Sequence, residues 1–264
     1  SILLAAIPLT AHNKDNSKDV KKPIEVIIDN GGSNNGNSNP GATRGGNKVI
    51  TNSIGSITVN SDYTSQGQNY RQRFIILHYT AVGKEGSLKT LTKEEVSAHY
   101  LVSDQKNDPV YYLVDEDKRA WHAGASEWKT TKNLNDSSVG IEIVNDGDAH
   151  GSFVPYKNFQ IKNVAVLVKY LADKYEIPAT NILGHEDIAP QRKSDPGPLF
   201  PWQELYQKYN IGMWYDNDRK QAYETQYSSA WNTVTPSVVQ NELKKFGYTI
   251  NVTNTWDKQT QNVI

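Results

Sequence analysis

One stretch of the chain, residues 181–202, limits most strongly what the rest can form. It reads Asn-Ile-Leu-Gly-His-Glu-Asp-Ile-Ala-Pro-Gln-Arg-Lys-Ser-Asp-Pro-Gly-Pro-Leu-Phe-Pro-Trp. Proline fixes the backbone angle φ, and glycine adopts conformations that other residues avoid. The stretch is therefore predicted to be a shaped loop and not a helix or a central strand. Such a loop can bring His185 and Asp195 together as two metal ligands.

A third ligand is predicted at the end of a short apolar run. The run Phe74–Leu77 directly precedes His78, and a continuous apolar run bounded by polar residues suits a strand covered on both faces. Two imidazoles, one carboxylate and an open position for water are a common composition of catalytic zinc sites. The residues alone leave an alternative open, because a histidine at a strand end is more often structural than a ligand.

Two further charged residues have chemistry that would suit such a site. Glu142 interrupts the apolar run Val139–Asn145, and a buried carboxylate needs a reason, which a metal site provides. It is the candidate to take a proton from water and pass it to a leaving amine. A buried ion pair with Lys or Arg is the alternative. Lys193, two residues before Asp195, is a cation that can stabilise the oxyanion of a tetrahedral intermediate.

Five runs occur in a fixed order along the chain. They are ILHYTA at 76–81, SAHYLV at 97–102, WHAG at 121–124, VGIEIVN at 139–145 and GHEDIAPQRKSDPGPLFPW at 184–202. Together they resemble the zinc-dependent N-acetylmuramoyl-L-alanine amidases, a family that also includes phage lysozyme-type amidases and peptidoglycan recognition proteins. The resemblance covers roughly residues 54–211. It is closest to periplasmic or outer-membrane amidases that carry a C-terminal peptidoglycan-binding domain.

The resemblance implies a role for five residues, each matched to the family's motif. His78, His185 and Asp195 stand at the positions of the zinc (Zn2+) ligands. Glu142 stands at the position of the acid/base, and Lys193 at that of the oxyanion partner. Zinc in such a site polarises a carbonyl oxygen and lowers the pKa of water toward about 7, which hydrolysis of an unactivated amide requires.

Other polar and aromatic residues in these runs receive weaker interpretations. Trp121 and His122 are candidates to line the substrate groove, with packing as the alternative. His99 is interpreted as structural. Glu186 and Asp187 flank His185 and are expected to support it or to lie in a solvated loop, not to act as additional ligands.

The implied reaction is hydrolysis of the amide between N-acetylmuramic acid, or also its anhydro form, and L-alanine of the peptidoglycan stem peptide. Two alternatives remain. One is a non-catalytic peptidoglycan-binding module, and the other is a cytoplasmic recycling amidase that acts on anhydro-muropeptides. Competent residues at all three ligand positions favour an enzyme. The expected partners are peptidoglycan and muropeptides, and the near-neutral charge of −1 gives no reason to expect nucleic acid.

The predicted fold class is α/β: a mixed central β-sheet covered by α-helices, followed by a small, incomplete all-α domain. Strands are expected at 73–80, 109–115 and 138–144, and helices at 87–99, 161–175, 203–209 and 237–247. The predicted domains are a signal-peptide remnant (1–12), a disordered tether (13–48), the catalytic domain (49–212), a connecting segment (213–235) and a partial peptidoglycan-binding-like domain (236–264).

The N-terminal residues predict a place in the cell envelope. The apolar run Ile2–Leu9 is too short to span a bilayer and fits the apolar part of a signal peptide. His12 stands where a lipoprotein signal has the lipid-bearing Cys, and the chain contains no Cys. We therefore expect a periplasmic protein, tethered to the outer membrane if a lipid is attached, with no transmembrane helix in the mature chain. We expect a monomer.

Overall fold

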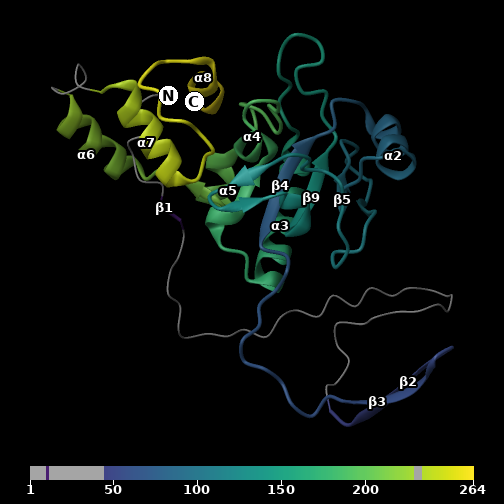
Figure 1. The fold of residues 1–264 in the computed structure, drawn as a ribbon. Helices are drawn as coiled ribbons and strands as arrows, with labels where there is room; N and C mark the ends of the chain where they lie inside the picture. Colours follow the sequence, from purple (N-terminus) through teal and green to yellow (C-terminus); the bar gives the residue numbers. More distant parts are fainter. Residues whose placement is uncertain (1–9, 12–44, 229–233) are drawn as a thin grey trace. The chain divides into compact units, whose positions relative to one another are not determined.

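The structure, a computed structural model, describes residues 10–11, 45–228 and 234–264 (Figure 1). The described residues 45–69 and 70–264 belong to two different compact units. In the smaller unit, β2 (Asn47–Asn52) and β3 (Gly55–Asn60) form an antiparallel hairpin whose residues are all exposed. Order was expected from Val49, which lies in β2. The predicted signal remnant and tether fall almost wholly outside the described residues.

A five-stranded sheet forms the centre of the larger unit, in the order β10-β4-β9-β5-β6 (Figure 1). Strands β10, β4, β9 and β5 run parallel to one another, and β6 pairs antiparallel with β5. The mixed sheet of the predicted fold class is thus confirmed. Its strands are β10 (Ile182–Gly184), β4 (Phe74–Tyr79), β9 (Ser138–Ile143), β5 (Tyr100–Val102) and β6 (Val110–Tyr112).

The sheet is covered on both faces, as the apolar run of β4 predicts. Ile75 and Leu77 point to the face that packs against helix α3 (Asn158–Tyr175). Phe74 and Ile76 belong to the apolar cluster of the opposite face. Since side chains alternate along a strand, His78 shares the face of Phe74 and Ile76.

Helix α3 forms because apolar residues recur at helical spacing along one face, and the residues at the centre of that face are buried against the sheet: Ile161, Val164, Ala165, Val168 and Leu171. It ends at Tyr175, where Glu176 adopts a left-handed conformation with φ of 55°. The predicted helix over 161–175 is therefore confirmed, and it stops before Pro178.

Helix α2 (Lys84–Lys93) begins earlier and ends earlier than the predicted helix over 87–99. Glu94 is already extended, and the chain then leads through His99 into β5. The prediction erred because the spacing of Leu88 and Leu91 indicates a helix but gives no signal for its end. The short strand β5 was not predicted.

Smaller elements connect the sheet to its loops. They are β7 (Glu127–Trp128) paired with β8 (Thr131–Lys132), the 3-10 turns at Leu134–Asp136 and Ala179–Asn181, α4 (His185–Ile188) and α5 (Trp202–Tyr209). The prediction of a short helix near 203–209 is confirmed.

The described residues of the C-terminal part, 213–228 and 234–264, form a strand and helices. The strand β11 (Met213–Trp214) pairs with β1 (Thr10–Ala11), and the helices are α6 (Asn217–Tyr227), α7 (Pro236–Phe246) and α8 (Lys258–Val263). Gly247 ends α7 as predicted. These helices belong to the same compact unit as the sheet, and a separate all-α domain stays a prediction. None of the helices in the described part of the chain is both long and apolar enough to cross a membrane.

Candidate active site

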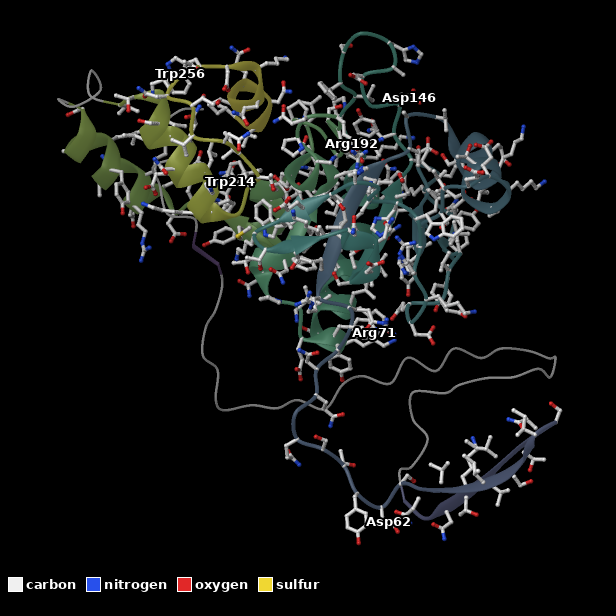
Figure 2. The ribbon with its side chains drawn as sticks, in the orientation of Figure 1. Asp62, Arg71, Asp146, Arg192, Trp214 and Trp256 are labelled. Carbon is white, nitrogen blue, oxygen red and sulfur yellow. The ribbon has the colours of Figure 1, made fainter. Side chains whose placement is uncertain are left out.

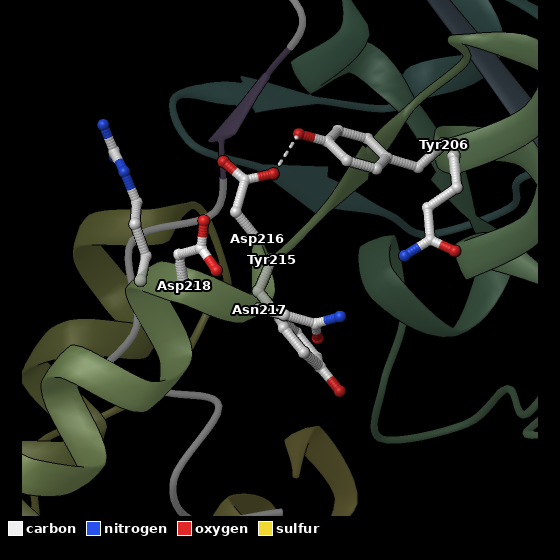
Figure 3. A pocket seen from close by; sticks show the side chains of 7 residues that line it. Tyr206, Tyr215, Asp216, Asn217 and Asp218 are labelled. Carbon is white, nitrogen blue, oxygen red and sulfur yellow. Dashed lines mark hydrogen bonds between the residues drawn. The ribbon is translucent and has the colours of Figure 1, made fainter.

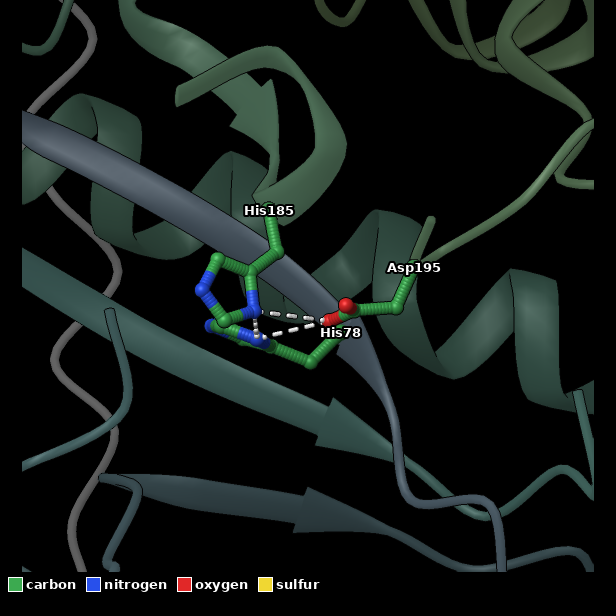
Figure 4. Close-up of side chains that lie close together, drawn as sticks. All are labelled: His78, His185 and Asp195. Atoms are coloured by element: carbon green, nitrogen blue, oxygen red, sulfur yellow. Dashed lines mark hydrogen bonds and ion pairs between the residues drawn. The ribbon is translucent and has the colours of Figure 1, made fainter. Parts of the chain in front are cut away.

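The three predicted metal ligands meet at the carboxyl ends of the parallel strands (Figure 4). Leu77 of β4 pairs with Gly184 of β10, so His78 and His185 are the next residues along two neighbouring strands. Asp195 comes from the loop after α4. The backbone of this loop returns to its start, because the N–H of Glu186 donates to the carbonyl of Asp195 at 2.8 Å. Binding sites of open α/β sheets lie at this edge.

The three ligand atoms form a tight triangle. The Nδ1 atoms of His78 and His185 are 3.0 Å apart, and each lies 2.9–3.0 Å from Oδ2 of Asp195. All three side chains are buried. Two imidazole nitrogens and one carboxylate oxygen converging on one point fit a zinc ion with an open coordination position. The structure thus brings together the predicted metal set.

Burial and charge favour the ligating forms of these groups. Burial, helped by the neighbouring His185, lowers the pKa of His78 to about 4, although Asp195 opposes the shift. Burial alone would raise the pKa of Asp195, but hydrogen bonds with His185 and His78 outweigh it and lower the pKa. His78 is therefore neutral and Asp195 ionised near neutral pH, which is what metal binding requires.

Glu142 lies beside the triangle, on the same face of the sheet as His78. The two residues pair directly across β4 and β9, and adjacent residues in a parallel pair point the same way. Burial and the Asp195 carboxylate raise the pKa of Glu142, and Lys193 opposes the shift. Its Oε2 atom is buried without a hydrogen-bond partner among the described residues. The alternative to a catalytic role is an ion pair of Glu142 with Lys or Arg. Among the described residues, Glu142 forms no such pair.

Lys193 is exposed at the rim of the site. Its charge lowers the pKa of both His78 and Glu142, which places its ammonium within electrostatic reach of the ligands and the acid/base candidate. Trp121 is also at the surface, with 54% of its area exposed, so its ring is available to a ligand.

His122 was a candidate to line the substrate groove, with packing as the alternative, and its side chain is packed in the interior. It is buried behind His78, with its Nδ1 atom 2.9 Å from Nε2 of His78 and its Nε2 atom 3.1 Å from Oγ of Ser138. It thus contacts a ligand and not an open groove. His99 accepts a hydrogen bond from the N–H of Gly140 and lies 3.0 Å from the carbonyl of Lys118, in agreement with the structural role expected for it.

A hollow of about 470 Å³ lies away from these ligands, between α5 and α6 (Figure 3). Its lining includes Tyr206 and Tyr215, and the hydroxyl of Tyr206 donates to Asp216 at 3.0 Å. None of the three ligands or Glu142 lines it. The hollow is therefore not part of the candidate active site.

Comparison with known proteins agrees with this geometry. The family model of N-acetylmuramoyl-L-alanine amidases matches residues 68–198. The N-acetylmuramoyl-L-alanine amidase AmiD of Escherichia coli is 39% identical over 189 residues, which cover 68% of this chain and 68% of AmiD. The chain belongs to the N-acetylmuramoyl-L-alanine amidase family. It spans about half the length of the AmpD amidases that it also matches.

Two solved structures of relatives share the fold of this amidase. AmpDh3 from Pseudomonas aeruginosa, in complex with anhydromuramic pentapeptide, is 37% identical with a TM-score of 0.70 over 78% of this chain and 86% of that one. Escherichia coli AmiD, in complex with anhydro-N-acetylmuramic acid-L-Ala-D-gamma-Glu-L-Lys, is 35% identical with a TM-score of 0.69 over 81% and 85%.

Several residues that support the site of this amidase were missed by the sequence analysis. Arg192, near α4 (Figure 2), donates to the carbonyls of Ala123 and Ala125 at 2.6 and 2.7 Å. The side chain of Asn135 accepts hydrogen bonds from the N–H groups of His122 and Ala123. Arg192 lies inside the longest family-like run, which was the available signal. Asn135 lies outside every run and gave none.

Glu186 and Asp187 lie outside the triangle of candidate ligands. Oδ2 of Asp187 accepts from the N–H of Gly184 at 2.7 Å and Oδ1 accepts from the hydroxyl of Tyr248 at 2.6 Å. Burial, together with the nearby Asp187 and Asp195, raises the pKa of Glu186 to about 8. The pair supports the start of α4 in this amidase, where His185 stands.

Proposed function

We propose that this protein is a zinc-dependent hydrolase that cleaves the amide between the lactyl group of N-acetylmuramic acid and L-alanine of the stem peptide. One observation carries the proposal. Two imidazole nitrogens and one carboxylate oxygen converge within about 3 Å of one another. Beside them lies Glu142, whose Oε2 atom is buried without a hydrogen-bond partner among the described residues.

Each residue of the site has a distinct part in the proposed mechanism. Zinc held by His78, His185 and Asp195 would polarise the scissile carbonyl and lower the pKa of a water molecule toward about 7. Glu142 removes a proton from the attacking water and returns it to the departing amine nitrogen of L-alanine. Its raised pKa suits the second role, because a protonated carboxyl group is then available. The products are a lactyl carboxylate and a free peptide amine.

Lys193 has an electrostatic role in the proposal. Water attack places negative charge on the former carbonyl oxygen, and a nearby cation lowers the energy of that state. The positive charge of Lys193 lowers the pKa of both Glu142 and His78, and we propose that the same charge stabilises the oxyanion. A contribution of this kind appears in the rate and not in zinc binding.

The substrate proposed includes the anhydro form of the muramic acid. The solved relatives AmiD and AmpDh3 hold anhydro-muramyl peptides, and each is more than a third identical to this chain over most of its length.

A single chain supplies all three ligands, and we therefore propose that a monomer is active. We place the enzyme in the cell envelope, where its substrate is found; immunodetection in separated cell fractions tests this.

A non-catalytic peptidoglycan-binding module is the competing function. Such a module needs neither a metal set nor a proton acceptor. Here both are present, and the burial of Glu142 without a hydrogen-bond partner is costly in a protein that only binds. The observation therefore favours catalysis.

Mass spectrometry of fragments released from purified peptidoglycan tests the proposal. We expect free peptides beginning with L-alanine, no release after chelation, and recovery when zinc is added. The variant Asp195→Ala should bind zinc poorly, because two protein ligands hold the ion weakly, and should release nothing. Near-stoichiometric zinc in this variant would remove Asp195 from the ligand set.

Two outcomes would contradict the proposal. Sedimentation of the protein with the cell wall without any released peptide would favour the binding module. Cleaved glycan strands with intact lactyl–peptide links would show that the site performs a different hydrolysis.

A further inference from the structure

One loop, residues 121–125, contacts both candidate histidine ligands from behind. The ring nitrogen of His78 that faces away from the ligand triangle, Nε2, lies 2.9 Å from Nδ1 of His122. The corresponding Nε2 atom of His185 lies 3.1 Å from the carbonyl oxygen of Ala123. Two adjacent residues of the loop therefore hold the two imidazoles.

With zinc bound, Nδ1 of each ligand would face the ion, and these contacts then provide an acceptor for the proton on the other ring nitrogen. A carbonyl oxygen only accepts, so Nε2 of His185 must donate to Ala123, and its Nδ1 is left with a free lone pair. In the same way, Nδ1 of His122 can accept from Nε2 of His78 while Nε2 of His122 donates to Oγ of Ser138, at 3.1 Å. Both ligands then present unprotonated Nδ1 atoms to the same point, the form that binds a metal ion.

The loop itself is anchored on three sides. Oδ1 of Asn135 accepts from the N–H groups of His122 and Ala123 at 3.1 and 2.7 Å. Arg192 binds the loop carbonyls from the far side. A Cβ atom on Gly140 would lie 2.4 Å from the His122 ring, so a glycine in β9 makes room for this imidazole. Such fixed surroundings hold His122 in one position.

We propose that the loop 121–125 is a positioning device for the metal ligands, with His122 as the positioning residue for His78 and the Ala123 carbonyl as that for His185. The inference rests on the proposed zinc-dependent function and deepens it. His122 touches neither substrate nor the reacting atoms. It acts by holding the ring orientation and the tautomer of His78. Loss of such a contact behind a ligand typically weakens metal binding about 10–100-fold.

The test is zinc affinity, measured by competition with a chromophoric chelator. His122→Leu removes the acceptor and should weaken zinc binding about 10–100-fold. His122→Asn places an amide oxygen near the position of Nδ1 and should restore most of the affinity. His122→Gln extends further along the side chain and should restore less. Gln160→Leu is the matched control, because it removes a buried polar side chain that contacts neither ligand nor His122 and should leave zinc affinity unchanged.

A second readout is the 15N spectrum of the histidine rings in the zinc-loaded protein. We expect His78 and His185 of the wild type to carry their protons on Nε2. In zinc-loaded His122→Leu, the Nε2–H signal of His78 should shift and exchange faster with solvent, because its acceptor is lost, while that of His185 should not change. Thermal unfolding of each variant separates this change from a loss of folding. If His122→Leu does not fold, the comparison of Asn with Gln at position 122 decides the question.

The outcomes distinguish this inference from the function on which it rests. Wild-type protein that binds no zinc would overturn the proposed function itself. Wild-type protein that binds zinc, with folded His122 variants of equal affinity and an unchanged His78 Nε2–H signal, would overturn the positioning role alone. An equal loss in Gln160→Leu and His122→Leu would also overturn it, because the effect would then be one of general destabilisation.

Discussion

At Glu142, the charge of Lys193 opposes the effects of burial and of Asp195 on the pKa, and the resulting pKa determines how readily the side chain exchanges a proton. Burial and Asp195 raise its pKa, and Lys193 lowers it. A carboxyl group with an elevated pKa exchanges protons more readily near neutral pH than an exposed one. The residue is thus suited to accept a proton and then donate it. Removing its charge while keeping its shape isolates this function.

Glu142→Gln should retain zinc binding and lose activity by about 10²–10⁴-fold, the usual contribution of a general acid/base. The measurement is kcat on a defined muropeptide beside the zinc content of the same sample. Glu186→Gln is the matched control, because this buried carboxyl group has a pKa of about 8, is protonated near neutral pH and resembles glutamine. Equal kcat in Glu142→Gln and wild type would exclude Glu142 from proton transfer.

Individual residues of the site could be predicted to different extents. The ligand roles of His78, His185 and Asp195 could be predicted, because histidine and aspartate are common metal ligands and these three lie in family-like runs. The structure brings them together. The position of His122 could not be predicted, because the sequence does not tell which face of a loop a side chain takes. Gly140 leaves room for the His122 ring, but this can be recognised only when the pairing of the strands is known.

Among the elements, the end of α3 is tied to the sheet through one buried carboxylate. Glu116 accepts hydrogen bonds from Tyr100 of β5 and from Lys174 and Tyr175 of α3. Burial alone would raise the pKa of Glu116, but the three donors outweigh it and lower the pKa below the ordinary 4.5. The ionised form is therefore more stable in the folded than in the unfolded protein.

Glu116→Gln should destabilise the protein at pH 7 by about 1.5–3 kcal/mol, the value of a hydrogen bond to a charged group. Because the folded-state pKa is depressed, the contribution is complete above pH 4.5 and is lost as the pH falls through the folded-state value. Urea unfolding at pH 7 and at lower pH checks both points. The exposed pair of Glu204 and Lys208 provides the control, since Glu204→Gln should change little. A difference that grows toward low pH would contradict this assignment.

Helices and strands were predicted correctly where their pattern of apolar residues extends over many positions. The α3 pattern extends over many residues, and β9 is an apolar run that only Glu142 interrupts, so both were found. The strands β5 and β10 are three residues long, which is too short for an alternation to be recognised. They exist because longer neighbours, β9 and β4, supply their hydrogen bonds.

At the scale of the whole molecule, the C-terminal helices contact the unit that carries the site. Trp128 packs edge-on against Phe246 and Tyr248, and the hydroxyl of Tyr248 donates to Asp187, two residues after the ligand His185. The N–H of Lys129 donates to the carbonyl of Gly247 at 2.8 Å. A domain joined only by a linker would make no such contacts. We infer that this part of the chain and the sheet unfold together.

Gly247→Ala is the substitution that tests this coupling. Gly247 has φ of +147°, and a Cβ atom there would lie 2.7 Å from the Trp128 ring, so the variant must separate α7 from the sheet domain or strain its backbone. We expect a single thermal transition whose midpoint falls by about 2–4 °C for each kcal/mol lost. Gly83→Ala is the control, because nothing lies near its Cβ position and its φ of −65° suits alanine. Two separate transitions, with the catalytic one unshifted, would mean that the C-terminal helices fold independently and that Tyr248 does not support the loop of His185.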